Sequence, residues 1–549
     1  MSVCCGTLER PRLAALTSPG SPSKLRGMAR FRWPPSVGDT GWSVGPVAAS
    51  DLALAPLLGI ALGYLALEFA LNGFHGYGYF TDELYYIACS KRLALGFVDH
   101  PSLTPLLLRG IRANFGESLP AMRFPAALAG AATVFLAGDM ARRLGGGRLA
   151  QMLAALSVAV APGPLILFGF YSTNAFEILV WTLCADLLIA LLAGADRRLW
   201  LAPGAVSGLG LENKHTTLAF GGALAIGLVV SPARKRLREP WPWLGLLVAL
   251  LVFLPNLLWQ ARNDWVSLEF YRIANAVKNV PTSAPRAAFD QALFMNPLTA
   301  SLWLAGLGFY LRHREGKRWS AVGVAFCALF ALILAVPTSR PDRIAGAYPM
   351  LLAAGSVVLA RSDLRWMRIA FLALLAVSTA ILAPLALPLL APPALARYAE
   401  TLHINPRIER QRMSRVPQWV ADRLDWPELA AAVAKVQREL PPADRARSAF
   451  LAGDYGYAGA LELYGPASGI ERVIGTHNQY YLWGPGEPAP EVVVALGFSG
   501  RDLERIFADV AQAAIFRCEF CYEDGMPIWV ARRPRIPLAA GWPSLKHFE

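Results

Sequence analysis

The sequence predicts a mainly α-helical, polytopic membrane protein with a small exported α/β domain at its C-terminal end. Hydrophobic residues make up 55% of the 549 residues and charged residues only 17%, and the mean hydropathy is +0.39. Soluble domains carry about 25% charged residues. Apolar stretches long enough to cross a bilayer recur as far as residue 390. Beyond about Pro392 charged residues return with short strand-like runs, which is typical of a soluble domain.

The net charge of +13 does not indicate a nucleic-acid partner, because the basic residues form short clusters between apolar stretches. Under the positive-inside rule such clusters mark cytoplasmic loops. The clusters are Arg142, Arg143 and Arg148; Arg197 and Arg198; Arg234, Lys235, Arg236 and Arg238; Arg312, Arg314, Lys317 and Arg318; and Arg361, Arg365 and Arg368.

Placing spans by length and loops by charge predicts about eleven crossings, with the N-terminus cytoplasmic and the C-terminal segment outside. We expect a disordered tail at 1–50, a transmembrane domain at 51–391 with its first outer loop at 73–118, and an exported domain at 392–549. Segment 199–211 is short and is a candidate for a broken or re-entrant span. The predicted spans are 52–72, 119–141, 149–170, 173–194, 199–211, 216–230, 241–259, 296–311, 320–337, 343–360 and 369–390.

The exported domain is expected to mix strands with helices. Cys518 and Cys521 form a CxxC pair there without the βαβ context of a redox site, which favours a structural disulfide or a packed pair. The predicted strands are Ser448–Ala452, Glu491–Leu496 and Pro527–Ala531, and the predicted helices are Pro427–Glu439 and Arg501–Ala511.

The first outer loop carries the most distinctive pattern of the chain. Its helical stretch TDELYYIACSKRLA places Asp82 and Glu83 in the first turn, where Thr81 or Asp82 is expected to cap the helix. A helix start explains such acids without any chemistry. The functional interpretation is that a carboxylate accepts a proton from an incoming nucleophile or binds a sugar hydroxyl. Tyr85 and Tyr86 would then offer stacking area and hydroxyl groups.

Further polar residues lie at the predicted outer ends of the spans. Asp99 and His100 before Pro101 fit either a turn or a phosphate contact. One Asp and one His do not make a metal site by spacing, so we predict no cofactor, with a divalent metal bound by Asp99 as the alternative. Three basic residues, Lys214, Arg340 and Arg343, fit either interface anchors or ligands of a lipid phosphate, with Glu212 a candidate partner of Lys214.

The order of several short motifs resembles the bacterial branch of glycosyltransferase family 39, whose relatives include the protein O-mannosyltransferases and the lipid A aminoarabinose transferases. The resemblance covers about residues 52–549, and its specificity lies in the order of the motifs. They are Asp82-Glu83-x-Tyr85-Tyr86, Gly96-Phe97-x-Asp99-His100-Pro101, GLGLENK, PNLLWQ at 255–260, AGAYPMLLAAG at 345–355, and then GDYGYAGAL, THNQYYLWGPG, CEFC and WPSLKHFE in the C-terminal part.

The resemblance implies a GT-C helical bundle in a bacterial inner membrane that transfers a sugar from a polyprenyl phosphate to a lipid, glycan or protein acceptor at the outer face. It makes Asp82 the catalytic acid of the first loop, with Glu83 beside it, and Lys214 a donor-phosphate ligand. Two departures from the family pattern are Ser102 in place of a second Pro and SRPDRI before AGAYP, which leaves phosphate binding to Arg340 or Arg343. The competing function is a membrane transporter of a lipid-linked or anionic substrate, since broken helices and intramembrane charges also occur in transporters.

Overall fold

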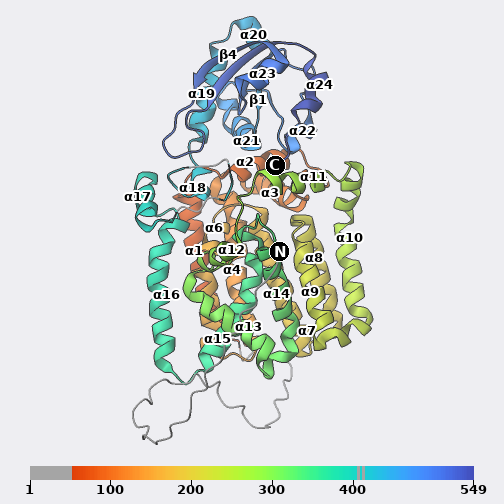
Figure 1. The fold of residues 1–549 in the computed structure, drawn as a ribbon, viewed down its shortest axis with the longest axis vertical. Coiled ribbons are helices and arrows are strands. Elements are labelled where there is room, and N and C mark those ends of the chain that lie inside the picture. The colour runs from red at the N-terminus through yellow and green to blue at the C-terminus, as the bar shows by residue number, and fades with distance from the viewer. Residues whose placement is uncertain (1–51, 405–407, 411–413) are drawn as a thin grey trace, which may run out of the picture. The chain divides into compact units, whose positions relative to one another are not determined.

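Helices form most of the structure, a computed structural model that describes residues 52–404, 408–410 and 414–549 (Figure 1). The tail expected at 1–50 lies outside the described residues. The described residues belong to one compact unit, so the boundary at 391 stays a prediction drawn from composition.

Each of the eleven predicted spans contains a helix, but fewer are long enough to cross a membrane alone. Among the described residues, seven helices pass by length and composition, or up to nine if two bent pairs count as one span each. The remaining two predicted spans correspond to α5 (Arg148–Ala159) and α8 (Leu201–Asn213). Both are shorter than the roughly 20 residues that a crossing requires. The seven are Leu54–Phe74, Leu119–Arg143, Thr173–Ala193, Pro240–Arg262, Glu315–Ala335, Pro341–Arg361 and Arg365–Ala386.

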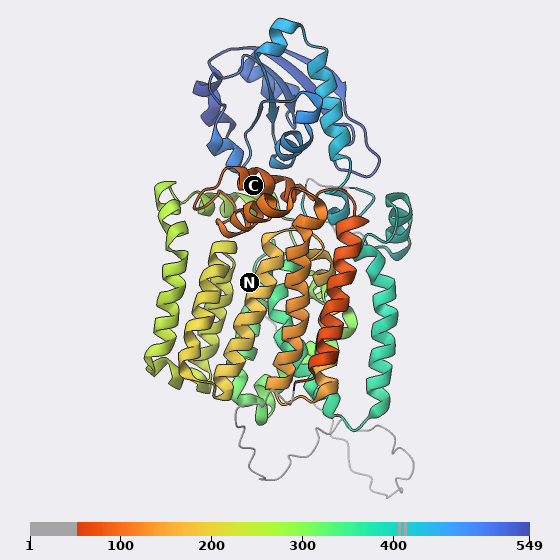
Figure 2. The same cartoon turned by 180° about the vertical axis from the view of Figure 1, so that it is seen from behind.

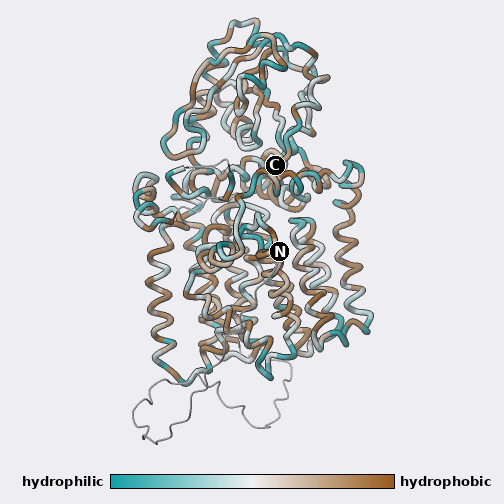
Figure 3. The backbone as a smooth tube through the Cα atoms, viewed as in Figure 1, coloured by the Kyte–Doolittle hydropathy of each residue, from teal (hydrophilic) through white to brown (hydrophobic). Residues whose placement is uncertain are grey.

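The helices of the bundle follow one another with short connections. Their exposed faces are apolar along the long outer helices, which appear brown in Figure 3. The bundle helices and the short helices among them are α1 (Leu54–Glu68), η2 (Phe69–Phe74), α4 (Leu119–Arg143), α5, α6 (Pro162–Leu167), α7 (Thr173–Ala193), η3 (Arg197–Trp200), α8, α9 (Thr217–Val230), η4 (Pro232–Arg238), α10 (Pro240–Arg262), α12 (Ala284–Phe294), η5 (Pro297–Thr299), α13 (Ala300–Arg312), η6 (Glu315–Trp319), α14 (Ser320–Ala335), η7 (Pro341–Ala347), α15 (Tyr348–Arg361) and α16 (Arg365–Ala386).

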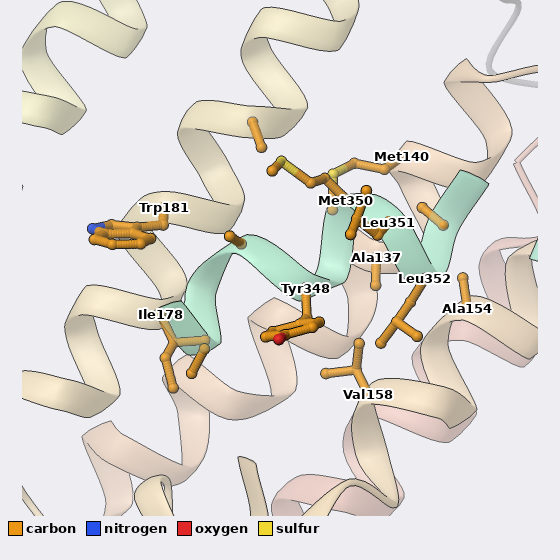
Figure 4. Packing of buried hydrophobic residues seen from close by; sticks show 14 of the residues in the cluster. Ala137, Met140, Ala154, Val158, Ile178, Trp181, Tyr348, Met350, Leu351 and Leu352 are labelled. Atoms are coloured by element: carbon orange, nitrogen blue, oxygen red, sulfur yellow. The ribbon is translucent and has the colours of Figure 1, made fainter. Parts of the chain in front are cut away.

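The centre of the bundle is built around α15, most of which is buried. Tyr348, Met350 and Leu352 on this helix belong to one cluster with Trp181 of α7 (Figure 4). The backbones of α13 and α15 approach so closely that a Cβ on Gly355 would lie 1.9 Å from the carbonyl oxygen of Leu302. Small residues permit such contacts where no hydrophobic force drives helices together in lipid.

The first outer loop folds into α2 (Thr81–Lys91) and α3 (Leu103–Phe115), which lie between the bundle and the C-terminal sheet (Figure 2). Almost all of α2 is buried. The outer loop after α10 forms α11 (Val266–Val277), and the chain beyond α16 forms α17 (Pro392–Leu402) and α18 (Gln418–Ala421).

The C-terminal part contains a five-stranded mixed sheet in the order β2-β1-β3-β5-β4. Strand β1 is parallel to β2 and β3, whereas β5 is antiparallel to β3 and β4. The strands are β1 (Ser448–Ala452), β2 (Val473–Gly475), β3 (Val492–Leu496), β4 (Phe507–Ile515) and β5 (Pro527–Pro534). The helices are α19 (Trp426–Arg438), α20 (Pro442–Ala446), α21 (Tyr455–Tyr464), η8 (Pro466–Ser468), α22 (Gln479–Trp483), α23 (Gly500–Ile506), α24 (Leu538–Gly541) and η9 (Trp542–Leu545).

The predicted α/β character of this part is confirmed, with one local error. The helix expected at Arg501–Ala511 stops at Ile506, and the following residues enter β4. The sequence FADVAQAAI is rich in alanine and favours a helix locally, but pairing with β5 overrides that preference. Cys518 and Cys521 form a disulfide, which is one of the two outcomes expected for them.

Candidate active site

A cavity of about 230 Å³ lies where the ends of several bundle helices meet the first turn of α2 and the segments leading to the sheet. Part of its wall is charged and part is apolar. The charged side chains are Asp82, Lys278, Arg286, Asp290, Arg340, Asp342, Glu409 and Asp422. The apolar side chains come mainly from α6, α12 and α16 and include Ile166, Leu167, Leu293, Phe294, Leu382 and Leu385. The cavity can therefore receive an amphiphilic molecule whose polar part lies among the charged side chains.

Asp82 lines this cavity from the first turn of α2. One of its oxygens accepts a hydrogen bond from the hydroxyl of Tyr455, at 2.9 Å. Burial raises the pKa of the Asp82 carboxyl above its ordinary value, while the charge of Lys278 and the Tyr455 hydrogen bond oppose that rise. A carboxylate with a raised pKa that faces a cavity is suited to accept a proton.

Glu83, the next residue, lies in the protein interior and does not line the cavity. One carboxylate oxygen accepts from Arg123 at 2.9 Å and from the backbone N–H of Tyr171 at 2.8 Å. The other accepts from Arg123 at 2.6 Å and from the backbone N–H of Phe80 at 2.8 Å. Glu83 therefore caps α2, the role expected of Thr81 or Asp82. We replace the catalytic assignment of Glu83 with a structural one, because Arg123 and two backbone groups occupy both oxygens.

Tyr85, Tyr86, Asp99 and His100 form a second group, which the structure brings together beside the cavity rather than in its wall. The Tyr85 hydroxyl donates to Asp99 at 2.8 Å and accepts from the backbone N–H of Gln479 at 3.2 Å. The rings of Tyr85 and Tyr86 meet the His100 ring edge-on at 5.6 and 5.1 Å. These contacts connect the first loop to the C-terminal domain, so direct substrate contact is not the role that this geometry favours.

Lys214 extends toward α7, where its ammonium donates to Glu177 at 2.8 Å and to Asn174. Asn174 lines the cavity, so Lys214 lies one side chain behind the wall. The expected partnership with Glu212 is wrong. Glu212 instead accepts from the Ser102 hydroxyl at 2.8 Å and from the backbone N–H of Asn256 at 3.2 Å.

Of the two predicted arginines, one lines the cavity and the other does not. Arg340 lines the cavity and pairs with Asp342 at 3.0 Å and with Glu409 at 3.7 Å. Arg343 does not line the cavity and donates to the side-chain oxygen of Asn275 at 3.3 Å. Of these two candidates for phosphate binding, Arg340 is the one in position to reach a ligand.

Several residues of the cavity wall were not found from the sequence, among them Lys278 and Tyr455. Lys278 lies at the end of α11, and its positive charge opposes the rise in the pKa of Asp82. Its ammonium pairs with Glu409 at 3.6 Å. It is a single lysine in an outer loop, and that pattern alone indicates no site. Tyr455 lies 373 residues from Asp82 in the sequence, and only its place in the motif GDYGYAGAL could have drawn attention to it.

One group of residues in the described chain has ligand atoms close enough to hold a metal ion. It consists of Asp425, Cys518 and Cys521. The two sulfurs are joined in the disulfide, so they are not available as thiolate ligands.

Comparisons with known proteins support the predicted resemblance. A family model described as dolichyl-phosphate-mannose-protein mannosyltransferase matches residues 99–259. A comparison with curated protein sequences finds no significant match. Among solved structures, ArnT from Cupriavidus metallidurans in the apo state aligns with a TM-score of 0.58 at 14% identity, covering 90% of this chain and 98% of that chain. The same protein bound to undecaprenyl phosphate aligns with a TM-score of 0.56 at 16% identity, covering 86% and 97%. The chain therefore has the fold of ArnT over nearly its whole length, and the predicted GT-C architecture is confirmed.

Proposed function

We propose that this chain is an integral-membrane glycosyltransferase that moves a sugar from a polyprenyl-phosphate donor to a lipid, glycan or protein acceptor of the cell envelope. The observation that carries the proposal is the cavity in which the Asp82 carboxylate, two cationic side chains and an apolar wall face the same space. The fold supports it, because ArnT, which shares this fold, has been solved bound to undecaprenyl phosphate. Cations stabilise an anionic leaving group, and a carboxylate can receive the proton of a hydroxyl.

The proposed reaction is a displacement at the anomeric carbon of the donor sugar. The acceptor hydroxyl attacks that carbon and gives its proton to Asp82, while the bond from the carbon to the phosphate oxygen breaks and its electron pair leaves with the phosphate. Lys278 and Arg340 would hold the departing phosphate, and the apolar side chains of α12 and α16 would hold the first part of the polyprenyl chain. Because a phosphate is already a good leaving group, no general acid is required.

The competing function, a transporter, is separated from this one by the fate of the sugar. The purified protein is reconstituted in proteoliposomes with a radiolabelled polyprenyl-phosphate sugar and an envelope extract as the source of acceptors. Transfer of label to a new product, lost in Asp82→Asn, supports the glycosyltransferase. Label that crosses the bilayer on the intact donor would support the transporter. Comparing the envelope glycans, glycolipids and glycoproteins of a deletion strain by mass spectrometry would then identify the sugar and the acceptor.

We also propose that the cavity and the C-terminal domain face the outside of a bacterial inner membrane, with the N-terminus in the cytoplasm. The clusters of Arg and Lys in the opposite loops support this orientation. Ala467 is exposed on η8, whereas Ser448 lies buried in β1. In a variant without other cysteines, a cysteine at position 467 should react with an impermeant maleimide in intact spheroplasts. Reaction only after lysis would reverse the orientation.

We propose that transfer needs no metal ion, since Lys278 and Arg340, two of the three cationic side chains of the wall, can neutralise the phosphate. Turnover should persist in excess EDTA. Loss of turnover in EDTA that Mg²⁺ or Mn²⁺ restores would show that a divalent ion takes part.

A further inference from the structure

The catalytic cavity is completed by the C-terminal domain, through the first turn of α21. Tyr455 opens this helix, lines the cavity and donates its hydroxyl to Asp82 at 2.9 Å. Its side chain is only 7% exposed, so burial and packing restrict where the hydroxyl can point. The contact joins two elements that the sequence separates by more than three hundred residues.

Two other aromatic rings pack against the ring of Tyr455. It lies 4.7 Å from the ring of Tyr85 and 4.8 Å from that of His477, measured between centroids. The backbone N–H of Tyr455 donates to Nδ1 of His477 at 3.3 Å. With Nδ1 accepting, Nε2 of His477 carries the proton and donates to the backbone oxygen of Glu549 at 3.1 Å. The hydroxyl therefore belongs to a packed and hydrogen-bonded unit.

Helices α21 and α2 also approach too closely for larger side chains. A Cβ on Gly456 would lie 2.2 Å from the Thr81 hydroxyl oxygen, and a Cβ on Gly459 would lie 2.9 Å from the backbone carbonyl carbon of Leu84. Asp454 caps α21 by accepting from the backbone N–H of Gly456 at 2.6 Å. The two glycines thus bring the first turn of α21 directly against the first turn of α2, which carries Asp82.

We propose that Tyr455 is a positioning residue for Asp82. The Tyr455 hydroxyl orients the Asp82 carboxylate so that one carboxylate oxygen faces the cavity for proton transfer. This inference rests on the proposed function of Asp82, and it makes the C-terminal domain a part of the active site rather than an appendage. A hydrogen bond to a carboxylate also favours its ionised form. Removing the hydroxyl should therefore make Asp82 easier to protonate.

The charged and titratable groups around Asp82 come from several elements, and Tyr455→Phe leaves all of them in place. Losing a hydrogen bond to a charged group shifts the titration midpoint of that group by about one pH unit or more. The groups are Lys278 at the end of α11, Glu409 in segment 408–410, Asp99 after α2, Arg340 before η7 and Tyr86 in α2.

The test measures the protonation of Asp82 without relying on turnover. The full-length protein in detergent is treated with a membrane-soluble carbodiimide, which reacts with protonated carboxyl groups, and the label on the Asp82 peptide is followed by mass spectrometry across pH. In Tyr455→Phe the half-point of labelling should rise by about one pH unit. Tyr457→Phe, on the same helix, is the matched control and should leave the half-point unchanged. An unchanged half-point in Tyr455→Phe overturns the proposal.

A second variant covers the case in which Tyr455→Phe does not fold. Incorporation of 3-fluorotyrosine at position 455 makes the hydroxyl more acidic and its hydrogen bond stronger, so the half-point should move downward; no movement overturns the proposal. Where the protein transfers sugar, the acid limb of kcat/KM should shift with the labelling. A wild type that transfers no sugar refutes the proposed function, and the labelling still decides the role of Tyr455.

Discussion

Asp82 and Glu83 are adjacent carboxylates in the same helical turn, and the structure gives them opposite surroundings. Asp82 faces a cavity that also holds Lys278 and Arg340. Glu83 faces the interior, where Arg123 and two backbone N–H groups occupy its oxygens. Successive residues of an α-helix point about 100° apart, so one turn can serve both the cavity and the core. One acid of the motif thus faces the cavity, while its neighbour stabilises the fold.

The largest effect should come from breaking the buried pair. Removing one partner of a buried ion pair costs about 3–5 kcal/mol, because the other charge stays buried without compensation. Glu83→Gln and Arg123→Met should each lower the unfolding temperature and the yield of folded protein, as measured by thermal unfolding in detergent. Asp82→Asn is the control and should unfold close to the wild type. Wild-type stability in Glu83→Gln together with a large loss of turnover would return Glu83 to a catalytic role.

The next effect concerns the cations of the cavity wall. A hydrogen bond to a charged group contributes about 1.5–3 kcal/mol, which corresponds to roughly tenfold or more in affinity. Lys278→Gln and Arg340→Gln should each raise the donor KM by about that factor and leave the acceptor KM unchanged. Lys214→Ala should raise the donor KM less, because Lys214 lies behind Asn174. Arg343→Gln, outside the wall, is the control, and a larger effect there than at Arg340 would contradict this assignment.

A smaller effect is expected where α21 packs on α2. Gly459→Ala introduces a Cβ 2.9 Å from the backbone of Leu84, and overpacking of this kind costs about 1–3 kcal/mol. Turnover and unfolding temperature should fall together, because the C-terminal domain can no longer bring Tyr455 to Asp82. Gly222→Ala, where a Cβ meets nothing within 4 Å, is the control. Normal turnover in Gly459→Ala would show that the close approach is not needed.

The smallest effect concerns the pH at which activity falls on acidification. Burial raises the pKa of Asp82 above its ordinary value, and a base must be deprotonated to act. Activity should therefore fall on acidification at a higher pH than an exposed aspartate would give. The sign for stability is opposite, since a carboxyl whose pKa is raised by folding stabilises the fold at low pH and loses that contribution as the pH rises. The pH profile of kcat/KM measures this fall of activity on acidification. In Asp82→Asn, a residual activity supported by another group should no longer show it.

Much of the fold followed from simple patterns in the sequence. Apolar length and basic clusters located the long helices of the bundle but not α12, which lies outside the predicted spans, and β1 begins and ends where the strand pattern placed it. Among the described residues, nine of the eleven predicted spans correspond to helices or bent helix pairs long and apolar enough to cross a membrane, because α5 and α8 are too short. Strand β4 was missed, since its pairing with β5 outweighs the helical preference of its alanines. Strand β2 was also not predicted.

The site was harder to predict, because its walls come from distant parts of the chain. The pattern around Asp82 was visible in a single loop. Lys278 and Tyr455 reach the cavity only through tertiary packing, and the only local signal for either is the motif GDYGYAGAL around Tyr455. The partner of Lys214 was misassigned to Glu212, its neighbour in sequence, whereas the fold presents Glu177 from another helix.

The central claim is that Asp82, and not Glu83, removes the proton of the acceptor. Asp82→Asn keeps the shape of the side chain and its contact with Tyr455 but removes the basic oxygen. Turnover of the purified variant, measured beside its unfolding temperature and its donor affinity, tests the claim directly. The account predicts a folded protein that binds donor normally and transfers sugar at least ~100-fold more slowly, since losing general-base catalysis costs about 10²–10⁴-fold. Turnover near that of the wild type would contradict it.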